Sequence, residues 1–288
     1  MRRLFVFLSA LSITLNTLGQ YKVKLESGSN PFVNRRLAII ADGADSKQNT
    51  LLINMFQRYW KTGPSVIVQD QKELDELQKT KDYVVLRHTA RISQDQKGEY
   101  RSDFLDFYTN EWQSNLATFY IDAAGMASNQ LYIKFFIRAL ENVREGRDSI
   151  DSRNLERNAD ELAVLRHNTL YIPSRMLMDG NDELLKGIAS SKAEIKKGSR
   201  QSITFGAYTF RYKVVSDAEL SELADDDTHT VCAANLVTMP DHSTGFYIYD
   251  VNAGKILYKC NQVERQINLA VIKDLNLAVM KTHLQSGL

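Results

Sequence analysis

Cysteine is almost absent from the chain. Its 288 residues include only Cys232 and Cys260, too few for a scaffold held by disulfides, so a packed core must supply the stability. Two alternatives are open for this pair: a disulfide in an oxidising compartment, or two buried thiols kept apart by a simple meander of strands. No histidine is placed locally to activate either thiol, which argues against a thiol nucleophile.

An excess of charge of one sign is missing too. Lysine and arginine number 36 against 35 aspartates and glutamates, which gives 36 − 35 = +1. A near-neutral chain gives no electrostatic reason to expect nucleic acid or anionic lipid as a partner. Beyond residue 18 there is no run of about 20 apolar residues, so we expect no stable membrane insertion.

The N-terminus has the pattern of a cleavable secretion signal over residues 1–19. Two arginines precede an uncharged stretch at residues 4–18, and the small residues Thr17 and Gly19 suit a cleavage that leaves Gln20 first. Cleavage changes the charge to 34 − 35 = −1. No cysteine lies near the cut, which excludes a lipid anchor at the new N-terminus. We predict an exported chain, periplasmic in preference to extracellular because it has at most one disulfide.

Apolar strands alternate with helical patterns along the rest of the chain, which predicts an α/β fold with mixed sheets, a C-terminal β-hairpin and a long final helix. We expect strands at 35–42, 65–70, 82–88, 117–122, 169–177, 209–217 and 229–237, and a hairpin over 245–260. We expect helices at 47–60, 71–79, 101–116, 130–147, 179–197, 218–223 and 263–283.

The two halves of the chain resemble each other. Residues 66–85 and 212–231 both read as a strand, a short helix with a repeated Glu-Leu, a polar turn and a second strand. The sequence "FYID" from Phe119 is echoed by "FYIYD" from Phe246. Repeats determine architecture, so we predict two tandem related modules, at residues 20–150 and 165–288, joined by a linker at 151–164. The alternative is that strand–helix–strand units look alike without common descent.

This pattern resembles the small α/β domains of bacterial envelope proteins, namely the N-terminal domain of TolB and the curli-secretion lipoprotein family. The resemblance rests on the short Glu-Leu helix, the "DYVV" strand and the hairpin "DVNAGKILY", with Asp250, Gly254 and Lys255 at its turn. It implies an interaction module and supplies no catalytic residues. The lipid-anchored members carry an N-terminal cysteine that this chain lacks.

Three aspartates are candidate site residues. Asp42 and Asp45 stand where a strand meets a helix, and Asp122 follows a later strand; such positions suit anions or acidic metal ligands. The segment lacks the spacing of a phosphate loop, so the simplest interpretation is a turn and a helix cap. The acidic runs at 179–183 and 224–228 are interpreted as polar turns.

The sequence contains no recognised motif for a metal site or for a hydrolase. The five histidines show no metal-binding spacing, and G-x-S-x-G is absent. A triad assembled from distant residues stays open. We therefore predict a binding or assembly module without catalysis, cofactor or metal, which holds another envelope protein by a sheet edge or by loops at strand ends. The alternative is a secreted hydrolase or small-molecule-binding protein with a cleft between the modules or at the carboxyl ends of the strands.

Overall fold

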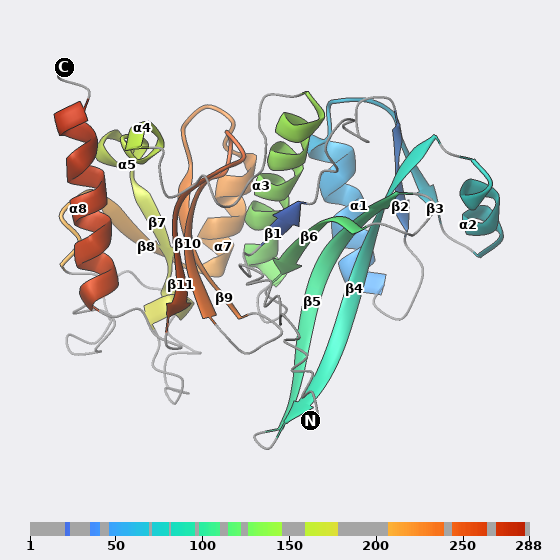
Figure 1. Ribbon diagram of the computed structural model, residues 1–288, viewed down its shortest axis with the longest axis horizontal. Coiled ribbons are helices and arrows are strands. Elements are labelled where there is room, and N and C mark those ends of the chain that lie inside the picture. The colour runs from blue at the N-terminus through green and yellow to red at the C-terminus, as the bar shows by residue number, and fades with distance from the viewer. Residues whose placement is uncertain are drawn as a thin grey trace, which may run out of the picture.

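Two mixed β-sheets stand side by side with helices between them and on both outer sides (Figure 1). The computed structural model describes residues 21–23, 35–40, 46–68, 71–80, 82–95, 98–109, 115–121, 126–145, 159–177, 207–238, 244–263 and 269–285.

The first half of the chain forms a six-stranded sheet. Its strands in spatial order are β1 (Tyr21–Val23), β6 (Asn115–Ile121), β5 (Gly98–Thr109), β4 (Tyr83–Asp95), β2 (Arg36–Ile40) and β3 (Ser65–Val68). Its helices are α1 (Ser46–Tyr59), α2 (Gln71–Gln78) and α3 (Met126–Arg144). The central strand β2 reads Leu-Ala-Ile-Ile after its first residue and is buried on both faces, as a strand covered on both sides must be.

The second half forms a five-stranded sheet. Its strands in spatial order are β11 (Lys255–Val263), β10 (Thr244–Asp250), β9 (Cys232–Thr238), β7 (Leu170–Pro173) and β8 (Tyr212–Val215). Its helical elements are α4 (Ala159–Leu162), α5 (Val164–His167), η1 (Ser174–Leu177), α7 (Asp217–Glu222), η3 (Leu223–Asp225) and α8 (Leu269–Gln285). α4 occupies part of the segment predicted as a linker, and the helix predicted at 179–197 lies outside the described residues.

The predicted α/β class is confirmed, and apart from β1, which has no described counterpart in the second sheet, the two sheets have the same topology. In the first, β2 is parallel to β3 and β4, and β5 and β6 follow as an antiparallel meander. In the second, β7 is parallel to β8 and β9, and β10 and β11 follow in the same way. This match agrees with the predicted duplication, and common descent of the modules stays a prediction.

The helix predicted over 101–116 is wrong, because β5 covers residues 98–109. The apolar residues at 104, 105, 107 and 108 fit a helical spacing and a strand equally well over so short a run. In the sheet, Leu105 and Phe107 point into the core on one face, while β4 and β6 pair with the backbone on either side. Tertiary pairing therefore decides the structure.

This correction also changes the internal comparison. The echoed sequences lie in β6 and β10, but the topological counterpart of β6 is β11 and that of β10 is β5. The similar sequences that begin at Phe119 and Phe246 thus lie in strands that do not occupy equivalent positions in the two sheets. The other matched segments, β3–α2–β4 and β8–α7–β9, do occupy equivalent positions in the two sheets.

Helix α3 lies between the two sheets and contributes to one core that both modules share (Figure 1). The sequence predicts an amphipathic helix here, yet Leu131 through Ile137 are all buried. A helix that is covered on all sides belongs to a core instead of a surface. On one side Phe136 meets Phe107 of β5, and on the other Phe135 meets Tyr249 of β10.

The outer faces of the two sheets have smaller cores. Leu74 and Leu77 of α2 cover the first sheet with Val85 beneath them. On the second sheet, α8 buries Ile272, Leu275 and Val279 against β9 and β10, and α4 packs against α8.

Neither cysteine forms a disulfide. Cys232 lies level with Asp250 of β10, whereas Cys260 lies level with Phe246, four residues away along the same strand. Four residues of strand span about 13 Å, and the two cysteines are also separated by an intervening strand. This is too far for a disulfide, so of the two alternatives the structure has the separate thiols.

The hairpin of β4 and β5 extends well past the rest of its sheet (Figure 1). β2 pairs with β4 only as far as Arg87, and β6 pairs with β5 only from Asp103 onward. Among the described residues, 88–95 of β4 pair only with β5, and 98–102 of β5 pair only with β4. They form a two-stranded ribbon, called here the β4–β5 ribbon, whose two outer backbone edges carry no further strand in the described part of the chain.

Candidate functional site

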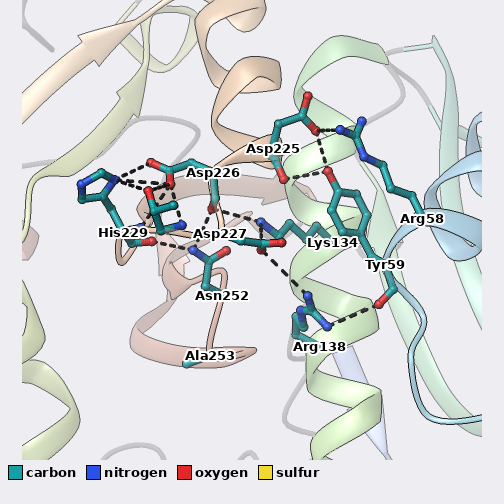
Figure 2. A network of polar contacts seen from close by, with 12 residues as sticks. Arg58, Tyr59, Lys134, Arg138, Asp225, Asp226, Asp227, His229, Asn252 and Ala253 are labelled. Atoms are coloured by element: carbon teal, nitrogen blue, oxygen red, sulfur yellow. Dashed lines mark hydrogen bonds and ion pairs between the residues drawn. The ribbon is translucent and has the colours of Figure 1, made fainter.

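A network of polar contacts lies between the modules (Figure 2). Helix α3 contributes Lys134, Arg138 and Glu141, which are spaced i, i+4 and i+7 and so lie on one face of the helix. The second module contributes the acidic residues Asp225, Asp226 and Asp227, which end η3 and follow it.

Lys134 is the buried centre of this cluster. Its side chain is 0% exposed, and its Nζ lies 2.9 Å from Oδ1 of Asp227, a carboxylate that is 52% exposed. The ammonium also donates to the carbonyl of Asp226 (3.2 Å) and lies over the ring of Tyr59. Burial lowers the pKa of Lys134. Partial burial acts to raise the pKa of Asp227, but Lys134, together with the charges of Arg138 and Lys61, holds that pKa below its usual value.

Tyr59 ties α1 to the same loop. Its hydroxyl lies 2.7 Å from both the Ala224 carbonyl and Oδ1 of Asp225, so these two acceptors share its single proton. Arg58 forms an ion pair with the same carboxylate at 2.8 Å. Burial, and then the Asp225 carboxylate, raise the pKa of Tyr59. The hydroxyl is therefore a fixed donor across the physiological pH range.

Arg138 and Glu141 complete the side of the cluster that faces the first module. Nη1 of Arg138 lies 2.7 Å from Oε2 of Glu141 and donates to the Tyr59 carbonyl at 3.3 Å. The other oxygen of Glu141 accepts the Lys61 amide at 2.6 Å. The end of α1 is thus hydrogen-bonded to the middle of α3.

A capping box places the acidic loop. The Ser216 hydroxyl accepts the Glu219 amide, and the Glu219 carboxylate accepts the Ser216 amide in return. This reciprocal pair defines the start of α7, and Leu220 fixes the helix against the shared core. The 3₁₀ helix η3 follows α7 directly, and its last residue, Asp225, lies beside the end of α1.

The β10–β11 turn is the second contact between the modules. The Asp250 carboxylate accepts the Ala253 amide at 3.0 Å, which shapes the turn, and Asn142 of α3 donates to the Ala253 carbonyl at 2.7 Å. Gly254 has φ +66° and lies directly against the backbone of α3. Lys255 pairs with Glu161 of α4 at 2.8 Å. The turn motif noted in the sequence is therefore used for packing within the chain.

Asp226, Thr228 and His229 contain the residue types of a catalytic triad. However, the Thr228 hydroxyl (2.8 Å) and the Asp226 carboxylate (3.0 Å) both contact Nδ1 of His229. A relay needs the nucleophile on one ring nitrogen and the carboxylate on the other. Thr228 and His229 instead hold the Asp226 carboxylate, whose pKa is lowered chiefly by the Thr228 hydroxyl and amide. This is a closed loop of local hydrogen bonds.

The sequence-predicted candidates Asp42, Asp45 and Asp122 lie outside the described residues. Within the described ranges, no group of three or more histidine, cysteine or acidic side chains is arranged to hold a metal ion. The cluster that the structure does bring together was missed by the sequence reasoning, which treated residues 224–228 as a polar turn. The available signal was the spacing of Lys134, Arg138 and Glu141 inside the otherwise apolar segment 131–141 of the helix.

Two buried asparagines give a stability prediction. Asn235 is 0% exposed, and neither of its side-chain polar atoms has a hydrogen-bond partner among the described residues. Asn276 is also buried, but it donates to the Ala207 carbonyl and accepts from Thr209. A buried polar group without a partner costs about 1–3 kcal/mol. We expect Asn235→Leu to raise the free energy of unfolding by about 1 kcal/mol and Asn276→Leu to lower it.

Urea denaturation of both variants measures this difference. A loss of stability in Asn235→Leu equal to that in Asn276→Leu contradicts the absence of a partner at Asn235.

None of the helices in the described ranges combines the length and the apolar character that a membrane crossing requires. No family model, no curated protein and no solved structure matches the chain.

Proposed function

We propose that the chain is an exported cell-envelope protein that acts as a binding or assembly module without catalysis, and that the β4–β5 ribbon holds its protein partner. The observation that carries the proposal is the ribbon itself, whose outer backbone edges at residues 88–95 and 98–102 have no further strand among the described residues. Such edges accept an extended segment of another chain by strand addition. The proposed export signal and the resemblance to envelope interaction domains support a partner in the periplasm.

The interior of the described structure also supports binding over catalysis. One form of the alternative function needs a cleft between the modules, whereas the space between the two sheets is filled by a common core. Phe56, Leu131 and Tyr247, from different parts of the chain, belong to that core and are fully buried. The charged residues at its border bond to one another (Figure 2).

A shortened hairpin tests the proposal. Thr89 and Phe104 are cross-strand partners, so a two-residue Asn-Gly turn can join them in place of residues 90–103. The segment of β4 that pairs with β2, up to Arg87, is kept. Far-UV circular dichroism and urea denaturation establish that the shortened chain still folds.

The readout is recovery of partners from envelope extracts by the tagged mature chain. We expect the full-length protein to recover a defined protein repeatedly and the shortened variant to lose it. Recovery of the same protein by both chains overturns the role of the ribbon. Recovery of none by the full-length chain, under several salt and detergent conditions, overturns the binding function.

A further inference from the structure

The outer edge of β5 over residues 98–102, which no described strand covers, has a charge pattern that is complementary to itself. Residues 98–102 pair with β4 on one side, while β6 reaches only Asp103 on the other. This outer edge reads Gly98, Glu99, Tyr100, Arg101, Ser102. Glu99 and Arg101 lie on either side of Tyr100. Reversing the direction of the strand therefore exchanges the negative and the positive position.

An antiparallel pair of two such edges, centred on Tyr100, therefore matches at every position. Glu99 of each copy lies opposite Arg101 of the other, Gly98 lies opposite Ser102, and Tyr100 lies opposite itself. No like charges face each other. Opposite charges directly across an antiparallel pair stabilise it, and like charges destabilise it.

The partner strand within the molecule does not account for this pattern. In the β4–β5 register Glu99 lies opposite Gln94, and Arg101 lies opposite Ile92. Neither of these β4 residues is charged. The acidic and the basic residue of β5 thus have no oppositely charged counterpart at the directly paired positions of β4.

We infer that two copies of this chain pair through the outer edges of β5 and form a four-stranded antiparallel ribbon with its two-fold axis at Tyr100. The inference rests on the proposed binding role of the β4–β5 ribbon and names its partner as a second copy. An antiparallel edge pair is a closed, two-fold interface, so it stops at the dimer. It also relieves a weakness of the fold, because a two-stranded ribbon is only marginally stable while a four-stranded one is better supported. Five residues a side make a small interface, so association depends on concentration.

Disulfide trapping tests the register. Residues directly opposite in an antiparallel pair have Cα atoms about 4.5–5.5 Å apart, within reach of a disulfide. We expect Tyr100→Cys to form a covalent dimer under mild oxidation with oxidised glutathione. Ser102→Cys is the matched control: its copies lie about 13 Å apart along the strands and should stay monomeric. The unsubstituted chain controls for Cys232 and Cys260.

Charge exchange tests the complementarity. We expect Glu99→Arg alone, or Arg101→Glu alone, to weaken self-association by at least about tenfold, since each places two pairs of like charges opposite one another. An equimolar mixture of these two variants should form a heterodimer, because the arginines of one chain then face the glutamates of the other at both positions. The double variant should dimerise as the original does. Sedimentation velocity over a concentration series measures all four samples.

The results separate the two proposals. Cross-linking at residue 100 but not at 102, with rescue in the mixture, supports the dimer. A monomer at all concentrations, equal cross-linking at both sites, or full association of the Glu99→Arg chain overturns it. If the dimer fails while an envelope protein is still lost on shortening the hairpin, the binding function stands and its partner is another protein.

Discussion

Replacement of Gly254 by alanine is expected to lower the free energy of unfolding by about 2–4 kcal/mol. Gly254 has φ +66°, a conformation that side chains with a Cβ rarely adopt. An added Cβ would lie 2.5 Å from the amide nitrogen of Ala139 and from the carbonyl carbon of Arg138. Both are backbone atoms of the central helix, which is packed between two sheets and cannot shift at low cost. The turn must therefore withdraw from α3.

Gly63 provides the comparison. It also has a positive φ, +144°, but its added Cβ would meet the guanidinium of Arg144, with Nη2 at 2.8 Å. The end of a flexible side chain can move aside, so the loss in Gly63→Ala reports backbone strain with little contribution from a clash. Urea denaturation followed by tryptophan fluorescence measures both. A loss in Gly254→Ala of only about 1 kcal/mol, the cost of the left-handed conformation alone, would mean that the turn's contact with α3 contributes nothing.

The second large effect is an asymmetry between the two members of one ion pair. We expect Asp227→Ala to cost about 2–4 kcal/mol, because it leaves the fully buried ammonium of Lys134 without its carboxylate. Lys134→Met should cost less than about 1 kcal/mol. Methionine keeps most of the apolar stem, and the half-exposed Asp227 remains hydrated.

The double variant checks the cause. If the loss in Asp227→Ala comes from the buried charge, adding Lys134→Met should restore most of the stability, and the double variant should be more stable than Asp227→Ala alone. Additive losses would contradict this explanation. Circular dichroism of each variant establishes that the secondary structure is unchanged.

The fold class was predictable because alternation of apolar strands and helical patterns is a local property. β2, α1 and β3 lie where the sequence places them. β5 was missed because its run of aromatic residues satisfies two periodicities, and only its pairing with β4 and β6 decides between them. The buried character of α3 was missed for a related reason: its polar residues look like a solvent-facing stripe until a second module covers them.

The polar cluster between the modules was not predictable from any motif. Lys134 and Asp227 lie in different modules, and neither belongs to a recognised pattern. The acidic loop resembles an ordinary turn, because local composition cannot reveal which distant cation it meets. The hairpin turn at Gly254 was recognised from the sequence, but its close approach to α3 depends on how the two modules dock.

The position of α3 has a consequence for synthesis of the chain. A ribosome completes α3 about a hundred residues before it completes β10, whose Tyr249 covers Phe135. Until then the newly made N-terminal half displays an aromatic surface that has no cover of its own. That interval is when the nascent chain is most prone to aggregate and most in need of a chaperone. A truncated product that stops between α3 and α4 should be insoluble, even though it contains all six strands of the first sheet.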